Sequence, residues 1–164
     1  MATVTTLAGG AVSRNTPSRQ VYSIENELDF AAAATAKGSA LAAADVIQVI
    51  NVPAGTVILN AGIEVTEAFA GENADTRLDL GVTGIDADVF VDGTDLTSAV
   101  AGDYAQNPAA YQPIVIGASA DTIDLLIQAS TTPPTSGKLR VWAVVMDISE
   151  RGTAVSVVRD TSTL

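Results

Sequence analysis

The sequence predicts an all-β protein, an antiparallel β-sandwich of about eight strands. A jelly roll, in which two four-stranded sheets pack together, fits that strand count best. Short segments of alternating apolar and polar residues recur along the chain. Clusters of Gly, Pro, Asn and Asp separate them, as turns do. Helical periodicity is almost absent, and no internal repeat indicates a solenoid or propeller.

The 164 residues fit one domain with two extensions. We predict an extended N-terminal arm over residues 1–20, a β-sandwich over 21–150, and a short C-terminal strand and tail over 151–164. The arm holds Arg14 and Arg19 and no acidic residue, whereas the rest of the chain carries six basic and nineteen acidic residues. Such a segment is either a frayed terminus or a docking arm that orders on a neighbour.

The first strand is expected at Val21–Phe30, where apolar and polar residues alternate. The alanine-rich residues 31–45 then favour a short helix, or an extended loop of small residues because Gly38 interrupts them. Asp45–Val52 and Thr56–Glu67 form the clearest pair of strands, since Pro53-Ala54-Gly55 between them is typical of a turn. In the second strand of this pair, one face is expected to hold Val57, Leu59, Ala61, Ile63 and Val65.

The middle of the chain predicts two further strands and a long connection. In Asp75–Val82 we expect the leucines to face the core and the charged residues Asp75, Arg77 and Asp79 to face solvent. Ala87–Val91 is a short strand that Asp92-Gly93 closes, and residues 93–112 are the connection.

Further strands are expected in the last third of the chain. Asp121–Ala129 precedes a turn over residues 131–137, which contains two consecutive prolines that no helix or strand would cross. Lys138–Ile148 is the strongest strand, and we expect Trp142 to be its largest core anchor. Ala154–Val158 is a last short strand before a polar tail.

Composition excludes most enzymatic mechanisms. The chain has no histidine and no cysteine, so it lacks the commonest general base, the commonest transition-metal ligand and any thiolate chemistry. A net charge of −11 disfavours a nucleic-acid partner. Aromatic residues are only 4%, which predicts an aliphatic core, and the mean hydropathy of +0.32 suggests that partners cover some apolar surface.

No membrane or export segment is expected. The apolar stretch from Val46 to Ile63 is interrupted by Pro53 and Gly55, so it cannot be a membrane helix. Residues 1–13 lack both the basic start and the apolar core of a secretory signal, which predicts a protein made in the cytosol.

Acidic residues supply the only motif-like patterns. Asp86, Asp88, Asp92 and Asp95 lie within ten residues and offer the oxygen ligands that calcium prefers, but without the EF-hand spacing. We favour a solvated strand face over a calcium site. The pairs Glu64 with Glu67 and Asp121 with Asp124 are nominal glycosidase acids, although the few aromatics argue against a sugar cleft.

Nucleophile and phosphate-binding motifs are missing. There is no G-x-S-x-G, and LAGGA near the start lacks the P-loop lysine. Trp142 and Phe90 are expected as core anchors rather than ligand platforms. We therefore predict a non-enzymatic protein with no catalytic residues, metal site or cofactor.

Three runs resemble small virion proteins of tailed phages, especially marine and cyanobacterial phages. They are ADVIQVINVPAGTVILNAGIEVTEAF, TRLDLGVTGIDADVFVDGTDL and ADTIDLLIQASTTPPTSGKLRVWAVVMDI. In that pattern a strand ends in V-P-A-G-T, a D-L-G segment precedes an acidic hairpin, and a G-x-L-x-V-W strand closes the sheet. The resemblance covers roughly residues 21–150.

This resemblance implies a capsid decoration (cement) protein. Such proteins are often trimeric jelly rolls that bind the outer surface of the major capsid protein shell after assembly in the host cytoplasm. The partners so implied are the major capsid protein and two further copies of the chain, with no nucleic acid and no membrane. An alternative is a phage tail or head-fibre module that binds a receptor or glycan, for which Tyr104 and Tyr111 are the available aromatic residues.

Overall fold

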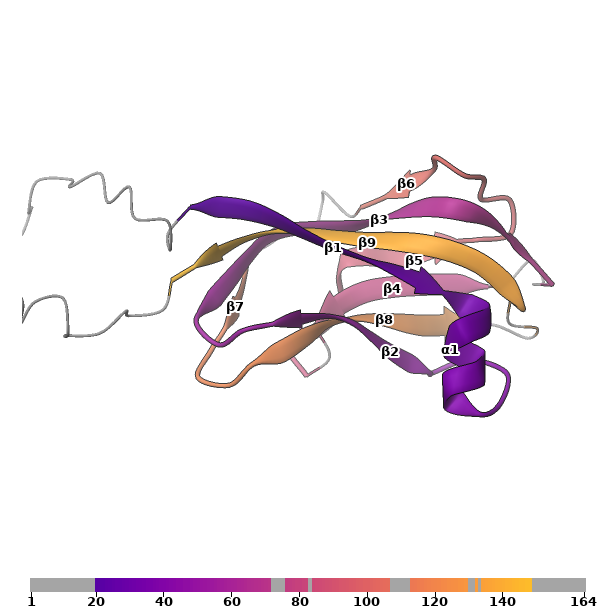
Figure 1. Cartoon of the computed structure of the whole chain (residues 1–164), viewed down its shortest axis with the longest axis horizontal. Coiled ribbons are helices and arrows are strands. Elements are labelled where there is room, and N and C mark those ends of the chain that lie inside the picture. The colour runs from indigo at the N-terminus through magenta and orange to yellow at the C-terminus, as the bar shows by residue number, and fades with distance from the viewer. Residues whose placement is uncertain are drawn as a thin grey trace, which may run out of the picture.

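The computed structural model describes residues 20–71, 76–82, 84–106, 113–129, 132 and 134–148. Two antiparallel sheets pack face to face (Figure 1), which confirms the predicted all-β sandwich. The first sheet has the order β1-β9-β3-β6, with β7 also on β3, and the second has the order β2-β8-β4-β5. The elements are β1 (Val21–Asp29), α1 (Phe30–Lys37), β2 (Val46–Val52), β3 (Thr56–Ala70), β4 (Arg77–Val82), β5 (Asp86–Asp95), β6 (Tyr104–Ala105), β7 (Ile114–Ile116), β8 (Asp121–Ala129) and β9 (Ser136–Asp147).

The connectivity is that of a jelly roll. Strands from the two ends of the chain alternate within each sheet, so that β9 lies between β1 and β3 and β8 lies between β2 and β4. The short strands β6 and β7 pair with different parts of β3. They therefore share one strand position, and the nine strands fill the eight positions that the sequence predicts.

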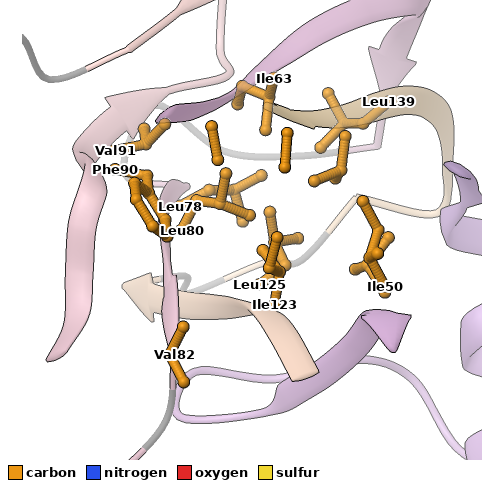
Figure 2. Close-up of a cluster of buried hydrophobic side chains, with 14 of the residues drawn as sticks. Ile50, Ile63, Leu78, Leu80, Val82, Phe90, Val91, Ile123, Leu125 and Leu139 are labelled. Atoms are coloured by element: carbon orange, nitrogen blue, oxygen red, sulfur yellow. The ribbon is translucent and has the colours of Figure 1, made fainter. Parts of the chain in front are cut away.

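The core lies between the two sheets and is mainly aliphatic, as the composition predicts (Figure 2). Its largest fully buried side chains are Phe30, Phe90, Ile58, Ile63, Leu78, Leu80, Leu96, Ile116, Ile123, Leu125, Ile127 and Leu139. Phe30 and Phe69 meet edge to face at 5.0 Å between ring centroids and close the end of the core beneath α1.

Residues 30–37 form a helix, and the extended loop is the alternative that the structure excludes. Asp29 accepts a hydrogen bond from the Ala32 amide as N-cap, and Gly38 ends the helix in the left-handed conformation at φ 79°. Phe30 is consequently the first helical residue and fully buried, not the end of the first strand.

The turn at residues 53–55 is present, but the two strands that it joins do not pair with each other. β2 pairs with β8 in one sheet, whereas β3 pairs with β9 in the other. Gly55 donates to the carbonyls of Ile116 and Gly117 and accepts from the Ile148 amide. These bonds hold the turn on the sheet of β3, so the chain crosses between sheets here instead of forming a hairpin.

A β-bulge changes which side chains of β3 face the core. The register with β9 shifts between Ile58 and Asn60, so Ile58 is fully buried and Leu59 only half-buried. Beyond the bulge, Ala61, Ile63 and Val65 face the core as predicted.

β4 and β5 also differ from the prediction. Asp79 is 3% exposed rather than solvated, and it accepts a hydrogen bond from the Gly93 amide at 2.7 Å. β5 runs on to Asp95, so Asp92-Gly93 lies within the strand and does not close it. The expected connection over 93–112 contains β6, and β7 had no sequence prediction.

The strongest predicted strand is confirmed as β9, but Trp142 is not in the core. Leu139, Val141, Ala143 and Val145 face the core, and Trp142 lies half-buried on the opposite face. The predicted arm over residues 1–20, apart from Gln20, and the predicted strand Ala154–Val158 lie outside the described residues. Within the described part of the chain, no helix has the length and apolar character needed to span a membrane.

Candidate interaction surface

The outer face of the five-stranded sheet carries a row of apolar side chains across four strands. In antiparallel strands, residues directly opposite each other share a face. The register places four such residues side by side, and we call them the apolar row: Val21 of β1, Met146 of β9, Val57 of β3 and Val115 of β7. Its two ends are open to solvent, with Val21 54% and Val115 55% exposed, while Val57 between them is only 7% exposed.

The next row on this face is also uncharged. It consists of Ser23, Val144 and Asn60, which lie opposite one another on β1, β9 and β3. We call these two rows together the uncharged end of the sheet. Among the described residues, a protein with a net charge of −11 thus keeps this part of the sheet face free of ionised groups.

Charged side chains occupy the other half of the same face. Arg140 lies between Glu27 and Glu64 and forms an ion pair with Glu64 at 3.1 Å between Nη1 and Oε2. Lys138 lies 3.6 Å from Glu67. Tyr104 lies opposite Glu64 on β6, and its hydrogen bond with that carboxylate raises the pKa of its phenol. We call this the charged half.

Trp142 separates the two halves. It lies between Glu25 and Gly62, and its ring covers Gly62 so closely that a Cβ there would come within 2.7 Å of the ring and 2.9 Å of the Ala105 carbonyl. Its indole Nε1 is buried with no hydrogen-bond partner. The ring therefore fills the hollow above a glycine and is not presented to solvent as a stacking platform.

The described chain begins and ends at the uncharged end. Val21, the first residue of β1, lies directly opposite Met146 near the end of β9. Figure 1 shows the start of β1, the end of β9 and β7 at one end of the sandwich, with α1 at the opposite end. Residues 1–19 and 149–164 consequently connect to the sandwich beside the apolar row.

The acidic residues predicted as a solvated face lie on or at the end of β5. Asp86, Asp88, Asp92 and Asp95 are all exposed. A side-chain hydrogen bond with Asp86 raises the pKa of Asp88, and hydrogen bonds from Thr97 lower that of Asp95. Among the described residues, no three acidic groups are arranged to hold a metal ion.

The sequence did not reveal that Asp79 of β4 is buried close to these acidic residues of β5. Burial raises the pKa of its carboxyl, and the negative charge of Asp92 adds to the effect. β5 covers this part of β4, because the carbonyl of Asp86 lies 2.2 Å from where a Cβ of Gly81 would be. Gly81, two residues after Asp79, is the only signal in the sequence that the backbone of β5 lies so close to β4.

The two nominal carboxylate pairs have other roles. Glu64 and Glu67 form separate ion pairs with Arg140 and Lys138. Asp121 accepts a hydrogen bond from the Thr122 amide at the start of β8, while Asp124 is 4% exposed within the other sheet. Neither pair is arranged as two acids facing a shared cleft.

Of the two tyrosines considered for ligand binding, one can be located. Tyr104 is 68% exposed and borders a shallow hollow with Thr94, Asp95 and Ser98. Tyr111 lies outside the described residues.

Comparison with known proteins identifies the fold. No protein-family model matches the chain, and no curated protein matches it in sequence. A chain of the capsid asymmetric unit of cyanophage Pam1 is similar in structure, with a TM-score of 0.62 and 15% identity over 88% of this chain and 96% of that one. A chain from the capsid of Ralstonia phage GP4 has a TM-score of 0.55 and 17% identity over 79% and 86%. At these identities the likeness establishes a shared fold.

Proposed function

We propose that this protein is a capsid decoration (cement) protein of a tailed phage, which binds the outer surface of the major capsid protein shell and stabilises the head. The observation that carries the proposal is the uncharged end, which contains the apolar row and beside which both terminal segments join the sandwich. Similarity in fold to chains of two phage capsid structures supports it.

The mechanism would be mechanical. Apolar surface that is exposed on the free protein becomes buried against the shell, and those contacts must break before the shell can expand or rupture. An interface of about 1,600 Å² gives useful affinity. A homotrimer bound at three sites multiplies that affinity through its high effective concentration. The protein would act on the virion exterior, after assembly in the host cytoplasm, and would have no enzymatic role.

Residues 1–20 supply part of the shell contact in this proposal. They have the opposite charge balance to the body and join it beside the apolar row. We expect deletion of residues 2–20 to lower occupancy on purified heads at least tenfold, while circular dichroism and oligomeric state stay as in the full chain. A second variant, Arg14→Ser with Arg19→Ser, tests whether the charge of the arm or its length matters.

Occupancy is measured by adding each variant to heads purified without the protein. Substitution of Ser13 and Ser18 by Ala is the matched control, because it changes the same segment without changing its charge. Unchanged occupancy of the deletion variant would exclude the arm from the contact. Absence of any binding by the full chain would exclude decoration itself.

The second candidate is a tail or head-fibre module that binds a receptor or glycan. The exposure of Tyr104 beside a polar hollow favours it. Binding of the isolated protein to a glycan array, lost in Tyr104→Ala, would support this function. A copy number on purified particles that matches the shell lattice would support decoration.

A further inference from the structure

Among the described residues, the two ends of the apolar row lie on the two edge strands of one sheet. β1 is the edge strand on one side, and Val21 is its exposed apolar residue. On the other side β7 pairs only with β3 among the described strands, and Val115 is its exposed residue. Val21 and Val115 face the same way at the same height of the sheet, three strand spacings apart, which is about 14 Å.

These two edges are complementary in direction. β1, β9, β3 and β7 alternate in direction, so β7 runs opposite to β1. If β1 of one molecule lies beside β7 of another in a continuous sheet, the new pair is antiparallel as well. The apolar row then continues from Val115 of one copy to Val21 of the next.

The charges of the two edges permit this contact. The first residues of β1, from Gln20 to Ile24, are uncharged, and so are residues 113–117 around β7. The acidic residues of β1 begin at Glu25, beyond the reach of the three-residue strand β7. Two molecules that each carry a charge of −11 repel least where they meet through uncharged surfaces.

The edge strand β5 of the other sheet is less suited to such pairing. β5 carries Asp86, Asp88 and Asp92 and two register shifts against β4, features that discourage the addition of a strand. By contrast, β1 pairs with β9 over nine consecutive residues without a shift. The start of β1 is therefore regular and uncharged, and both features suit it to accept a neighbouring strand.

We propose that a second copy of this chain docks along the edges of the five-stranded sheet, beside the uncharged end, by head-to-tail strand addition, with the start of β1 next to β7 of the next copy and Val21 opposite Val115. A head-to-tail contact joins unlike surfaces, so it generates either a closed ring or a filament. Three copies in a ring give the homotrimer of the proposed function. The inference rests on that proposed association of copies and is independent of binding to a capsid.

Engineered thiols test this contact directly, because the chain has no cysteine of its own. Directly opposed residues of antiparallel strands have Cβ atoms about 4.5–5.5 Å apart, close enough to form a disulfide with a small adjustment. We expect Val21→Cys mixed with Val115→Cys to give covalent dimers under mild oxidation, at least fivefold more than either variant alone. A single chain carrying both substitutions should give closed trimers or longer covalent ladders on a denaturing gel.

Val46→Cys mixed with Val115→Cys is the matched control, since Val46 is 45% exposed on β2 of the other sheet. Cross-linking of Val21→Cys alone, as strong as that of the mixture, would overturn the proposal in favour of a two-fold contact between β1 strands. A monomeric full chain in light scattering at 100 µM would overturn it as well.

A charged substitution in the apolar row tests the proposed contact independently of the cross-linking. We expect Val115→Asp to weaken association at least tenfold in sedimentation equilibrium, whereas Val46→Asp leaves it unchanged. If Val115→Asp does not fold, as judged by circular dichroism, Val115→Ser replaces it, with a threefold weakening expected. All these measurements use the purified protein alone, so a failure of capsid binding is seen separately.

Discussion

At the level of single residues, Asp79 shows that a strand can be predicted correctly while the solvent exposure of one of its side chains is predicted wrongly. Alternation places its side chain opposite to the core leucines Leu78 and Leu80, and that part of the prediction is right. The expectation that Asp79 is solvated rests on its polarity alone and is wrong, since the residue is 3% exposed. β5 covers this position, and its Gly93 amide donates a hydrogen bond to the Asp79 carboxylate. That contact depends on how β4 pairs with β5, which apolar-polar alternation does not encode.

Burial makes Asp79 a source of pH-dependent stability. Its raised folded-state pKa means that the protonated form is favoured by folding. Its stabilising contribution is therefore complete below the unfolded-state pKa and is lost as pH rises through the folded-state pKa. We expect Asp79→Asn, which keeps an acceptor for the Gly93 amide, to gain stability relative to wild type as pH rises from the unfolded-state pKa through the raised folded-state pKa, by an amount of order 1 kcal/mol.

Urea unfolding followed by tryptophan fluorescence at several pH values measures this difference. Asp95→Asn is the control, for which the change in stability with pH should have the opposite direction. Hydrogen bonds from Thr97 lower the pKa of Asp95 instead of raising it. The contribution of Asp95 is present above its unfolded-state pKa and is lost as pH falls through the lower folded value. A constant difference between Asp79→Asn and wild type across this range would contradict the explanation.

At the level of elements, the sequence predicts strands well where one face is buried throughout. β9 alternates almost without interruption, and the positions of β8 and β9 agree with the prediction within two residues. The short strands β6 and β7 have two and three residues, too few for a recognisable period. Periodicity also could not reveal which strands pair, so the turn at residues 53–55 suggested a hairpin where the chain changes sheets.

The packing of β3 against β9 gives the element-scale prediction. Gly62 lies beneath Trp142, and a Cβ at this position would come within 3.0 Å of both the ring and the Ala105 backbone. We expect Gly62→Ala to destabilise the protein by about 1–3 kcal/mol, since the backbone of β6 cannot move away without losing its pairing with β3. Thermal unfolding measures the loss, and the fluorescence of Trp142, the only tryptophan, reports the altered ring environment.

Gly117→Ala is the matched control, because nothing lies within 4 Å of the position that its Cβ would occupy. Its unfolding temperature should stay within about 1–2 °C of wild type, in keeping with a substitution that makes no close contact. Equal effects of the two substitutions would mean that the lost glycine flexibility, and not the contact with Trp142, determines stability.

At the level of the whole molecule, the distribution of charge connects the sequence to the surface. Composition predicted an acidic body with apolar surface left for partners, but not where that surface lies. The apolar row forms only when residues 21, 57, 115 and 146, which are far apart in the chain, become neighbours across four strands. The fold class was therefore accessible from sequence, whereas the candidate surface required the sheet order and register.

This arrangement predicts an unusual dependence of self-association on salt. Two acidic molecules repel each other at long range, and the contact proposed between the start of β1 and β7 contains no ion pair that salt could weaken. Raising the ionic strength from 0.01 M to 0.15 M shortens the screening length from about 30 Å to about 8 Å. We expect association of the full chain to strengthen at least threefold over that range, as measured by sedimentation equilibrium.

Weaker association at the higher salt concentration would indicate a contact between opposite charges, such as an arm carrying Arg14 and Arg19 on the charged half of another copy. In that case Val115→Asp should leave association unchanged, whereas Arg14→Ser with Arg19→Ser should reduce it.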